Sequence, residues 1–240
     1  MKVGVKTYTD KEGYKYIKKI IDYCDFIEIL PIPTNKFWKK FKDYDIPFTI
    51  HAAHQAFGAD PGHIKSHKKT DLCLNTAIEA ANYFDSDVIV VHPGAVGKTR
   101  KSSMRIALKY LKKFKEPRFH IENLPSWKHH IELGTYPEEI ETLMKKLNAK
   151  FCFDLSHAAL SAPMLKVDYK KFVKSFMRLK PKYFHMCGGN VMKHDDHHPL
   201  MEGNYDQDYF KSLLPKRARV LLETPHNLKK HIRDISFLKK

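Results

Sequence analysis

No hydrophobic run in the 240-residue sequence is long enough to cross a membrane, because every apolar segment falls short of the roughly 18–20 residues that a spanning helix needs. A secretory signal is also absent, since the N-terminal segment Met1-Lys2-Val3-Gly4-Val5 is typical of a strand. We therefore expect a soluble cytoplasmic protein that has no membrane partner.

Cysteine is scarce and its spacing is irregular. The four residues, Cys24, Cys73, Cys152 and Cys187, form no CxxC pair. This argues against a structural zinc site built from thiolates and favours buried free thiols in a reducing compartment. Cys187 follows His185 by two residues and is a candidate for lining a pocket rather than a favoured ligand. No convincing serine or cysteine triad is present.

Acidic residues are in deficit. There are 27 Asp and Glu against 43 Lys and Arg, which gives a formal net charge of +16. Such a surface attracts polyanions, and contacts between Lys or Arg and phosphates release counterions. Many basic proteins nevertheless bind nothing in particular, so charge alone does not establish nucleic-acid binding.

The chain has no linker, no low-complexity segment and no internal repeat beyond an alternation of strands and helices. Its length and 42% hydrophobic content fit one large core, so we predict a single domain over residues 1–240. Eight strands alternating with helices predict a (β/α)8 TIM barrel. The expected strands lie near residues 3–6, 26–30, 48–51, 88–92, 118–122, 151–154, 183–185 and 220–223, and the expected helices near 12–24, 67–84, 99–114, 137–147, 168–179, 205–214 and 227–238.

Six of the expected strands end on a residue that can bind a metal ion. In a barrel of this kind the carboxyl ends of the strands meet in one mouth, where active sites are found. Mixed imidazole and carboxylate ligands suit Zn²⁺, with Mn²⁺ or Fe²⁺ as alternatives. Several carboxylates at one mouth would repel each other unless cations neutralised them. The six residues are His51, His92, Glu122, Asp154, His185 and Glu223.

A polar stretch follows the seventh expected strand. Residues 195–204 begin Asp195-Asp196-His197-His198 and contain a proline and a glycine, which predicts a loop. A solvated polar loop is the simpler interpretation. Together with His157, which follows Asp154 by three residues, Asp195 and His197 are candidates for holding a further metal ion. We therefore interpret the site as multinuclear.

These motifs resemble those of the endonuclease IV family of apurinic/apyrimidinic endonucleases, within the xylose-isomerase-like TIM barrel superfamily. The resemblance covers nearly the whole chain and the motifs fall in family order. They are Ile50-His51-Ala52, Val91-His92-Pro93-Gly94, Ile121-Glu122-Asn123, Cys152-Phe153-Asp154-Leu155-Ser156-His157, Phe184-His185, residues 195–204 and Leu222-Glu223-Thr224.

The resemblance implies a site with three zinc ions and an enzyme that acts on damaged double-stranded DNA as a monomer. The enzyme would hydrolyse the phosphodiester on the 5′ side of an abasic site, with a metal-activated water as nucleophile, and leave a 3′-hydroxyl. Glu122, as a bridging ligand, and Glu223 are the predicted catalytic carboxylates. By resemblance, the first ion would be held by His51, His92 and Glu122. The second would be held by Glu122, Asp154, His185 and Glu223. The third would be held by His157, Asp195 and His197.

Four residues are predicted to contact DNA. Asn35, Lys36 and Trp38 follow the second expected strand, in the region where the family inserts a residue into the DNA stack. Phe37 and Trp38 are equally consistent with a hydrophobic lid or a helix face. His54 stands where the family has a tyrosine near the abasic nucleotide.

Two other functions remain open from the sequence. A sugar or sugar-phosphate isomerase or epimerase of the same superfamily would need one metal ion, held by Glu122, Asp154, His185 and Glu223, with two acids transferring protons. A non-catalytic barrel that binds nucleic acid or stores metal is the third possibility. Metal content separates the first two, because the nuclease interpretation needs three ions per chain and the isomerase interpretation one.

Overall fold

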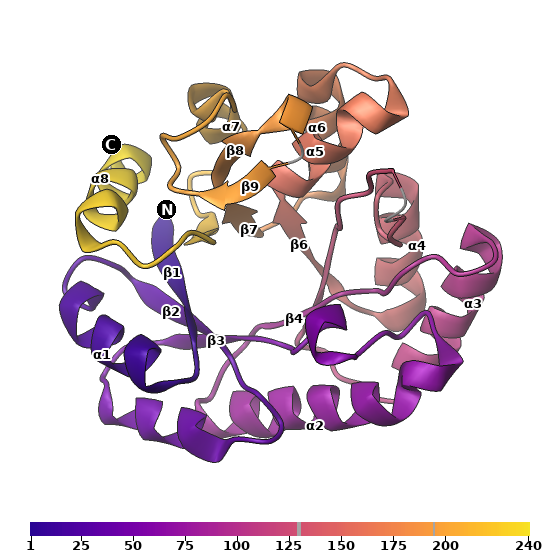
Figure 1. Ribbon diagram of the computed structural model, residues 1–240, viewed down its shortest axis with the longest axis horizontal. Coiled ribbons are helices and arrows are strands. Elements are labelled where there is room, and N and C mark those ends of the chain that lie inside the picture. The colour runs from indigo at the N-terminus through magenta and orange to yellow at the C-terminus, as the bar shows by residue number, and fades with distance from the viewer. Residues whose placement is uncertain (129–130, 194) are drawn as a thin grey trace.

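The computed structural model describes residues 1–128, 131–193 and 195–240. Parallel strands close into a barrel in the order β1-β10-β7-β6-β5-β4-β3-β2, and helices surround it (Figure 1). This confirms the predicted (β/α)8 TIM barrel. The barrel strands are β1 (Lys2–Tyr8), β2 (Phe26–Leu30), β3 (Phe48–His51), β4 (Ile89–Val91), β5 (Phe119–Glu122), β6 (Lys150–Asp154), β7 (Tyr183–Met186) and β10 (Arg219–Leu222).

The helices alternate with the strands and pack against the outside of the barrel. The large hydrophobic core lies between the two layers. In the described part of the chain no helix is both long and apolar enough to cross a membrane. The helices are α1 (Lys11–Ile20), α2 (His67–Tyr83), α3 (Arg100–Leu111), α4 (Pro137–Leu147), α5 (Leu155–Leu165), α6 (Tyr169–Phe176), α7 (Gln207–Leu213) and α8 (Leu228–Lys239).

The alternation of side chains along each strand places a hydrophobic floor below the polar mouth. Phe26, Cys152 and Tyr183 belong to a small buried cluster inside the barrel. Successive residues of a strand face opposite sides, so the inward residues two positions later stand one layer higher. Those residues are Glu28, Asp154 and His185, which are all buried. The two-residue alternation of the strands therefore places these polar side chains at the mouth, directly above an apolar layer.

Glycine is required at one point of this floor. A Cβ on Gly4 would lie 2.5 Å from the Phe26 ring, which fills the space beside β1. Any larger residue at position 4 would displace that ring from the barrel interior, where packing leaves little room for adjustment.

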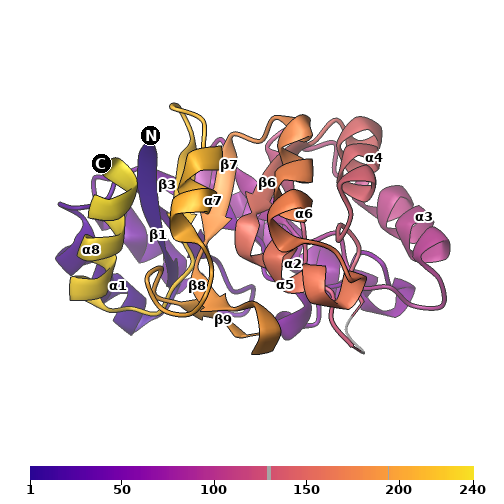
Figure 2. The ribbon, with the colours of Figure 1, turned by 90° about the horizontal axis from the view of Figure 1, so that it is seen from above.

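Two segments differ from the expected structure. The strand β6 continues directly into α5, a helix that the sequence pattern does not predict. The stretch expected to be a loop contains β9 (Asp195–His198), which pairs antiparallel with β8 (Gly188–Asn190). Figure 2 shows this hairpin at one end of the barrel and the N-terminus at the other. Backbone pairing with the glycine-rich β8 gives the polar segment a fixed conformation despite its loop-like composition.

The prediction that Trp38 contacts DNA is wrong. Trp38 lies in a 3₁₀ segment, η1 (Lys36–Asp43), and is fully buried against the end of α2, with its ring 5.6 Å from that of Tyr83 and 6.1 Å from that of Phe84. The alternative interpretation, a helix face, is the one the structure supports. Asn35 is exposed and caps η1 by accepting a hydrogen bond from the Phe37 amide.

Candidate metal centre

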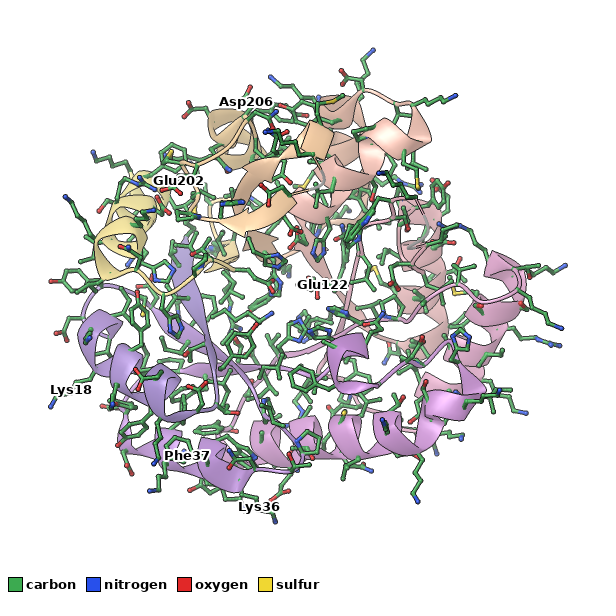
Figure 3. The ribbon with its side chains drawn as sticks, viewed as in Figure 1. Lys18, Lys36, Phe37, Glu122, Glu202 and Asp206 are labelled. Carbon is green, nitrogen blue, oxygen red and sulfur yellow. The ribbon has the colours of Figure 1, made fainter. Side chains whose placement is uncertain are left out.

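Glu122 lies at the centre of the mouth, at the end of β5 (Figure 3). One of its oxygens is 3.2 Å from His51 Nε2 and 3.0 Å from His92 Nε2, while the other is 3.1 Å from His185 Nδ1. The Glu122 side chain is fully buried. A single carboxylate therefore lies between imidazoles that come from three other strands.

The residues predicted for the second ion also meet. Glu122, Asp154, His185 and Glu223 each offer a ligand atom, and these atoms all lie within 4.8 Å of one another. His185 Nδ1 is 3.0 Å from Glu223 Oε2. Asp154 is the member of this group that comes from β6, and it also serves as the N-cap of α5.

A third group joins α5 to the hairpin. It consists of His157, Asp196 and His197, whose ligand atoms satisfy the same distance limit. Asp154 accepts a hydrogen bond of 2.7 Å from the His157 amide, which fixes the first turn of α5 and directs His157 toward the mouth. The Cys187 thiol accepts from the His197 amide at 3.2 Å, so Cys187 supports the group from below.

Asp196 takes the place that the family pattern assigns to Asp195. The Asp195 carboxylate points away and lies 2.8 Å from His198 Nε2, where its side chain is 53% exposed. His197 has a φ of 58°, in the left-handed region, and this interrupts the alternation of β9. As a result Asp196 and His197, although adjacent in sequence, both face the mouth.

This difference gives a matched pair of variants. We expect Asp196→Ala to lower the affinity for the third ion by about 10–100-fold or more. Removing a residue that merely hydrogen-bonds to a metal ligand already lowers metal affinity by about that factor, and Asp196 would be a ligand itself. Asp195→Ala should keep wild-type metal content. Metal analysis of the two dialysed proteins measures this directly, and loss confined to Asp195→Ala would support the family assignment instead.

Electrostatics at the mouth favour cations. Burial opposes ionisation of Glu122, but the imidazoles of His185 and His92 outweigh it and hold its pKa well below the usual range. Burial also raises the pKa of Glu223, but the positive charge of Lys6 lowers it more strongly, so that this pKa is well below normal too. Burial raises the pKa of Asp154 to about 6, because the attraction of His157 offsets it only in part. Both glutamates are therefore anionic at neutral pH in a buried site.

The imidazoles hold protons that a metal ion would displace. Burial lowers the pKa of His185, but the thiol and carboxyl groups around it raise it more strongly, so its net pKa lies well above normal. The same competition, with Asp154 as the strongest partner, leaves the pKa of His157 raised. In His92 burial dominates and lowers the pKa to about 4. Protonated imidazoles thus neutralise the carboxylates in the absence of metal.

The donor set fits zinc. Imidazole nitrogens and carboxylate oxygens are its usual ligands when thiolates are absent. Among the described residues, Glu223 Oε2 is buried and accepts no hydrogen bond, although His185 Nδ1 lies nearby. A buried oxygen without a hydrogen bond is costly unless a cation is bound to it. The site therefore has both the ligands and an unsatisfied acceptor for a metal ion.

Sequence reasoning missed two charged residues of this mouth. Lys6 of β1 places Nζ 2.5 Å from Glu223 Oε1 and 3.9 Å from Glu28 Oε1. Glu28 of β2 is fully buried and lies 3.2 Å from His185 Nε2. Both sit two residues before their strand ends, so a search of terminal positions alone passes over them. The inward period of the strands is the signal that identifies them.

A cavity of about 530 Å³ lies above the metal-binding residues. Lys6, His54 and His226 line it together with four of the candidate ligands, His92, His157, His197 and Glu223. The His54 ring stacks on that of His92, with centroids 4.5 Å apart, so His54 is placed to meet a substrate, and its DNA contact stays a prediction. Lys36, in contrast, lies at the outer edge of the barrel in Figure 3, and its amine is 3.9 Å from Glu79 of α2.

Solved structures of two different enzyme classes resemble this chain. A D-tagatose 3-epimerase-like protein matches with a TM-score of 0.76 and 20% identity, over 100% of this chain and 96% of that one. Endonuclease IV from Thermus thermophilus matches with a TM-score of 0.72 and 17% identity, over 100% and 98%. At these identities the likeness establishes the fold and does not choose between the activities.

Sequence comparison gives the family. The uncharacterized protein MJ1311 of Methanocaldococcus jannaschii is 24% identical over 201 residues, which cover 75% of this chain and only 64% of that protein. The family model described as xylose isomerase-like TIM barrel matches residues 8–240. The chain, with its closed barrel and its ring of candidate metal ligands at one mouth, therefore belongs to the xylose isomerase-like TIM barrel family.

Proposed function

We propose that this chain is a multinuclear metal-dependent phosphodiester hydrolase that cleaves on the 5′ side of abasic sites in damaged double-stranded DNA. The observation that carries the proposal is that three of the five groups of possible ligands found among the described residues correspond to the three predicted ions, and Glu122 belongs to two of these three. A sugar isomerase needs only the group around Asp154. The extra groups, built from His51, His92 and His157 among others, have no role in that chemistry.

Hydrogen bonds fix the orientation of the imidazoles. His51 Nδ1 lies 2.9 Å from the Ala52 carbonyl and His157 Nδ1 2.9 Å from the Asn123 carbonyl. A carbonyl only accepts, so both nitrogens carry the proton and each Nε2 is left as a ligand atom. On His185 the roles reverse, because Nε2 faces Glu28 and Nδ1 faces Glu122 and the site. Partners of this kind raise the basicity of metal-binding imidazoles.

The chain's carboxylates and cations divide the remaining work. Bound metal ions would lower the pKa of water and stabilise charge on the phosphate oxygens. Glu122 would be the shared ligand, since its two oxygens face different groups. Lys6 is held between Glu223 and Glu28 and lines the cavity, where its positive charge attracts an anionic substrate.

Lys6→Met tests this assignment. We expect turnover to fall by about 10–100-fold, as for other partners of metal ligands. Burial raises the pKa of Glu223, and the charge of Lys6 is the main influence that lowers it. Without Lys6 the pKa of Glu223 should rise, so the variant should need a higher pH for activity. A pH–rate profile that keeps its acid limb would contradict this role. Lys11→Met, a change at an exposed lysine at the start of α1, is the control.

The proposed activity is tested with a duplex that carries one abasic-site analogue and an undamaged duplex of the same sequence. We expect one cut on the 5′ side of the lesion, dependent on zinc and absent from the undamaged strand. No cut by a folded protein shown to contain metal would reject the proposal.

Sugar epimerase or isomerase chemistry is the second candidate. It is favoured by the completeness of the group formed by Glu122, Asp154, His185 and Glu223, which suffices to bind one metal ion, and by the half-enclosed cavity above it. Metal analysis separates the two proposals, since one ion per chain together with turnover of a ketose or its phosphate would favour this candidate.

A further inference from the structure

The end of the barrel opposite the mouth is strongly basic on one side. Four segments that lead from the ends of helices into the first residues of the next strands, residues 112–118, 145–150, 177–182 and 214–219, together contain thirteen Lys and Arg residues and a single Glu. They lead into β5, β6, β7 and β10, which are consecutive neighbours in the closed sheet. The four basic segments, hereafter the basic crescent, therefore lie side by side at one end of the molecule.

The other side of the same end is acidic. Three connections, residues 21–25, 43–47 and 84–87, contain six Asp and no Lys or Arg. They lead into β2, β3 and β4, which are also consecutive in the barrel. The helical turns before the first two of these segments carry Lys18, Lys19, Lys40 and Lys42, so this side is much less basic than the crescent.

Most cations of the basic crescent have no carboxylate partner. Four of the thirteen form ion pairs, for example Arg118 with Glu116 at 2.7 Å and Arg178 with Glu138 at 2.7 Å. Across residues 1–128, 131–193 and 195–240, no ion pair is found for the other nine, and all nine are exposed. They are Lys112, Lys113, Lys115, Lys146, Lys150, Lys180, Lys182, Lys216 and Arg217.

A cavity of about 580 Å³ adjoins the crescent. Lys2, Lys216 and Arg217 line it, and none of these three has an ion-pair partner among the described residues. Arg219, which also lines it, is held by both oxygens of Asp87 at 2.8 Å and marks the border with the acidic half. Asp25 and Asp87 line it as well, so this concave surface lies at the border between the crescent and the acidic half.

The excess positive charge does not surround the mouth. The loops on that side, residues 9–10, 31–35, 52–66, 92–99, 123–136, 187–206 and 223–227, contain four Lys and eight acidic residues. The loops at the mouth are therefore net acidic, although the whole chain has a net charge of +16.

We propose that the basic crescent is a second, sequence-independent binding surface for the phosphate backbone of nucleic acid. Unpaired cations on adjacent loops gain free energy by displacing the counterions condensed on such a backbone. The acidic half repels the same polymer and confines it to the crescent. The surface is separate from the mouth and does not depend on the reaction that takes place there.

Two other partners fit less well. Insertion into a membrane surface needs several exposed apolar side chains beside the cations, whereas Met1, which lines the adjoining cavity, is the one exposed large hydrophobic residue of the described chain found there. A second copy could offer only its six aspartates, of which Asp25 and Asp87 already pair with Lys239 and Arg219. Neither partner neutralises the crescent as a polyphosphate does.

The test compares two quadruple variants of the intact chain. The first, Lys112→Gln, Lys146→Gln, Lys182→Gln and Arg217→Gln, removes one unpaired cation from each segment of the crescent. The control, Lys11→Gln, Lys68→Gln, Lys101→Gln and Lys229→Gln, removes exposed lysines from the first turns of α1, α2, α3 and α8, near the mouth. Fluorescence anisotropy with a labelled undamaged duplex is measured over a salt series.

We expect the crescent variant to lose at least about tenfold in affinity and about 3 to 4 units of the slope of log K against log salt, since each phosphate contact contributes about 0.9. The control should bind like wild type. Equal losses in both variants, or a slope near zero in wild type, would overturn the proposal. Stronger binding to phosphatidylserine vesicles than to the duplex, or a dimer that only the crescent variant loses, would overturn it in favour of those partners. Circular dichroism confirms that both variants fold.

Discussion

Glu122→Gln should reduce turnover by at least about a thousandfold while leaving the protein folded, because several kcal/mol of charge stabilisation is lost at about 1.4 kcal/mol per tenfold. The amide keeps the size of the side chain and can accept a hydrogen bond from an imidazole. It cannot supply the negative charge that holds two cations together. Since Glu122 belongs to the ligand groups proposed for the first and the second ion, bound metal should also decrease.

The experiment measures metal content and turnover of the same preparation, on abasic duplex and on sugar substrates alike. Both candidate activities use Glu122, so the result tests the site independently of the reaction class. Glu138→Gln on α4 is the control, because in the described part of the chain that exposed carboxylate pairs only with Arg178 and such surface pairs are worth at most about 1 kcal/mol. Wild-type turnover in Glu122→Gln would show that the shared-ligand assignment is wrong.

The barrel and most of the ligand ring could be predicted from the sequence for one physical reason. Parallel strands of a barrel end at the same edge, so a ligand type repeated at strand ends, such as His51, Glu122 and His185, must converge. The sequence of one strand is enough to identify the candidate ligand at its end. Closure of the barrel then supplies the distances between strands that the sequence does not state.

The errors fall where this rule does not apply. Asp196 replaces Asp195 because a left-handed backbone at His197 turns a short strand, a feature that depends on pairing with β8. The segment around Trp38 predicts a DNA contact by its resemblance alone, whereas the burial of that ring depends on α2, far away in sequence. Lys6 escapes a search of strand ends because it lies two residues before the end of β1. Long-range contacts decide the first two positions.

Removing the metal should make the protein's stability depend on pH in a way that the metal-loaded form does not share. In the metal-free state the pKa values of His185 and His157 are raised, so their contribution to the free energy of unfolding is complete below about pH 6.5, the ordinary value, and is lost as pH rises through the folded pKa. Glu122 and Glu223 have lowered pKa values, so their contribution is present above about pH 4.5 and is lost in acid.

The raised pKa values of His185 and His157 therefore predict that the stability of the metal-free protein declines toward pH 8 and above. Metal binding should reverse the loss of stability at alkaline pH, because the ion replaces the protons on His185 and His157. Its affinity rises about tenfold per pH unit for each proton displaced. Stabilisation by zinc should therefore grow from pH 6 to pH 8 by about 1.4 kcal/mol per unit per proton.

Denaturant unfolding of the dialysed and the zinc-loaded protein across this range measures the difference directly. Calorimetric titration of zinc in buffers of different ionisation enthalpy counts the released protons. In Glu122→Gln the growth with pH should be smaller, because the amide holds neither the metal ions nor the protons on the surrounding imidazoles. A stabilisation by zinc that is the same at both ends of the range, with no proton release, would contradict this prediction, because it would mean that these histidines do not exchange a proton for the metal ion.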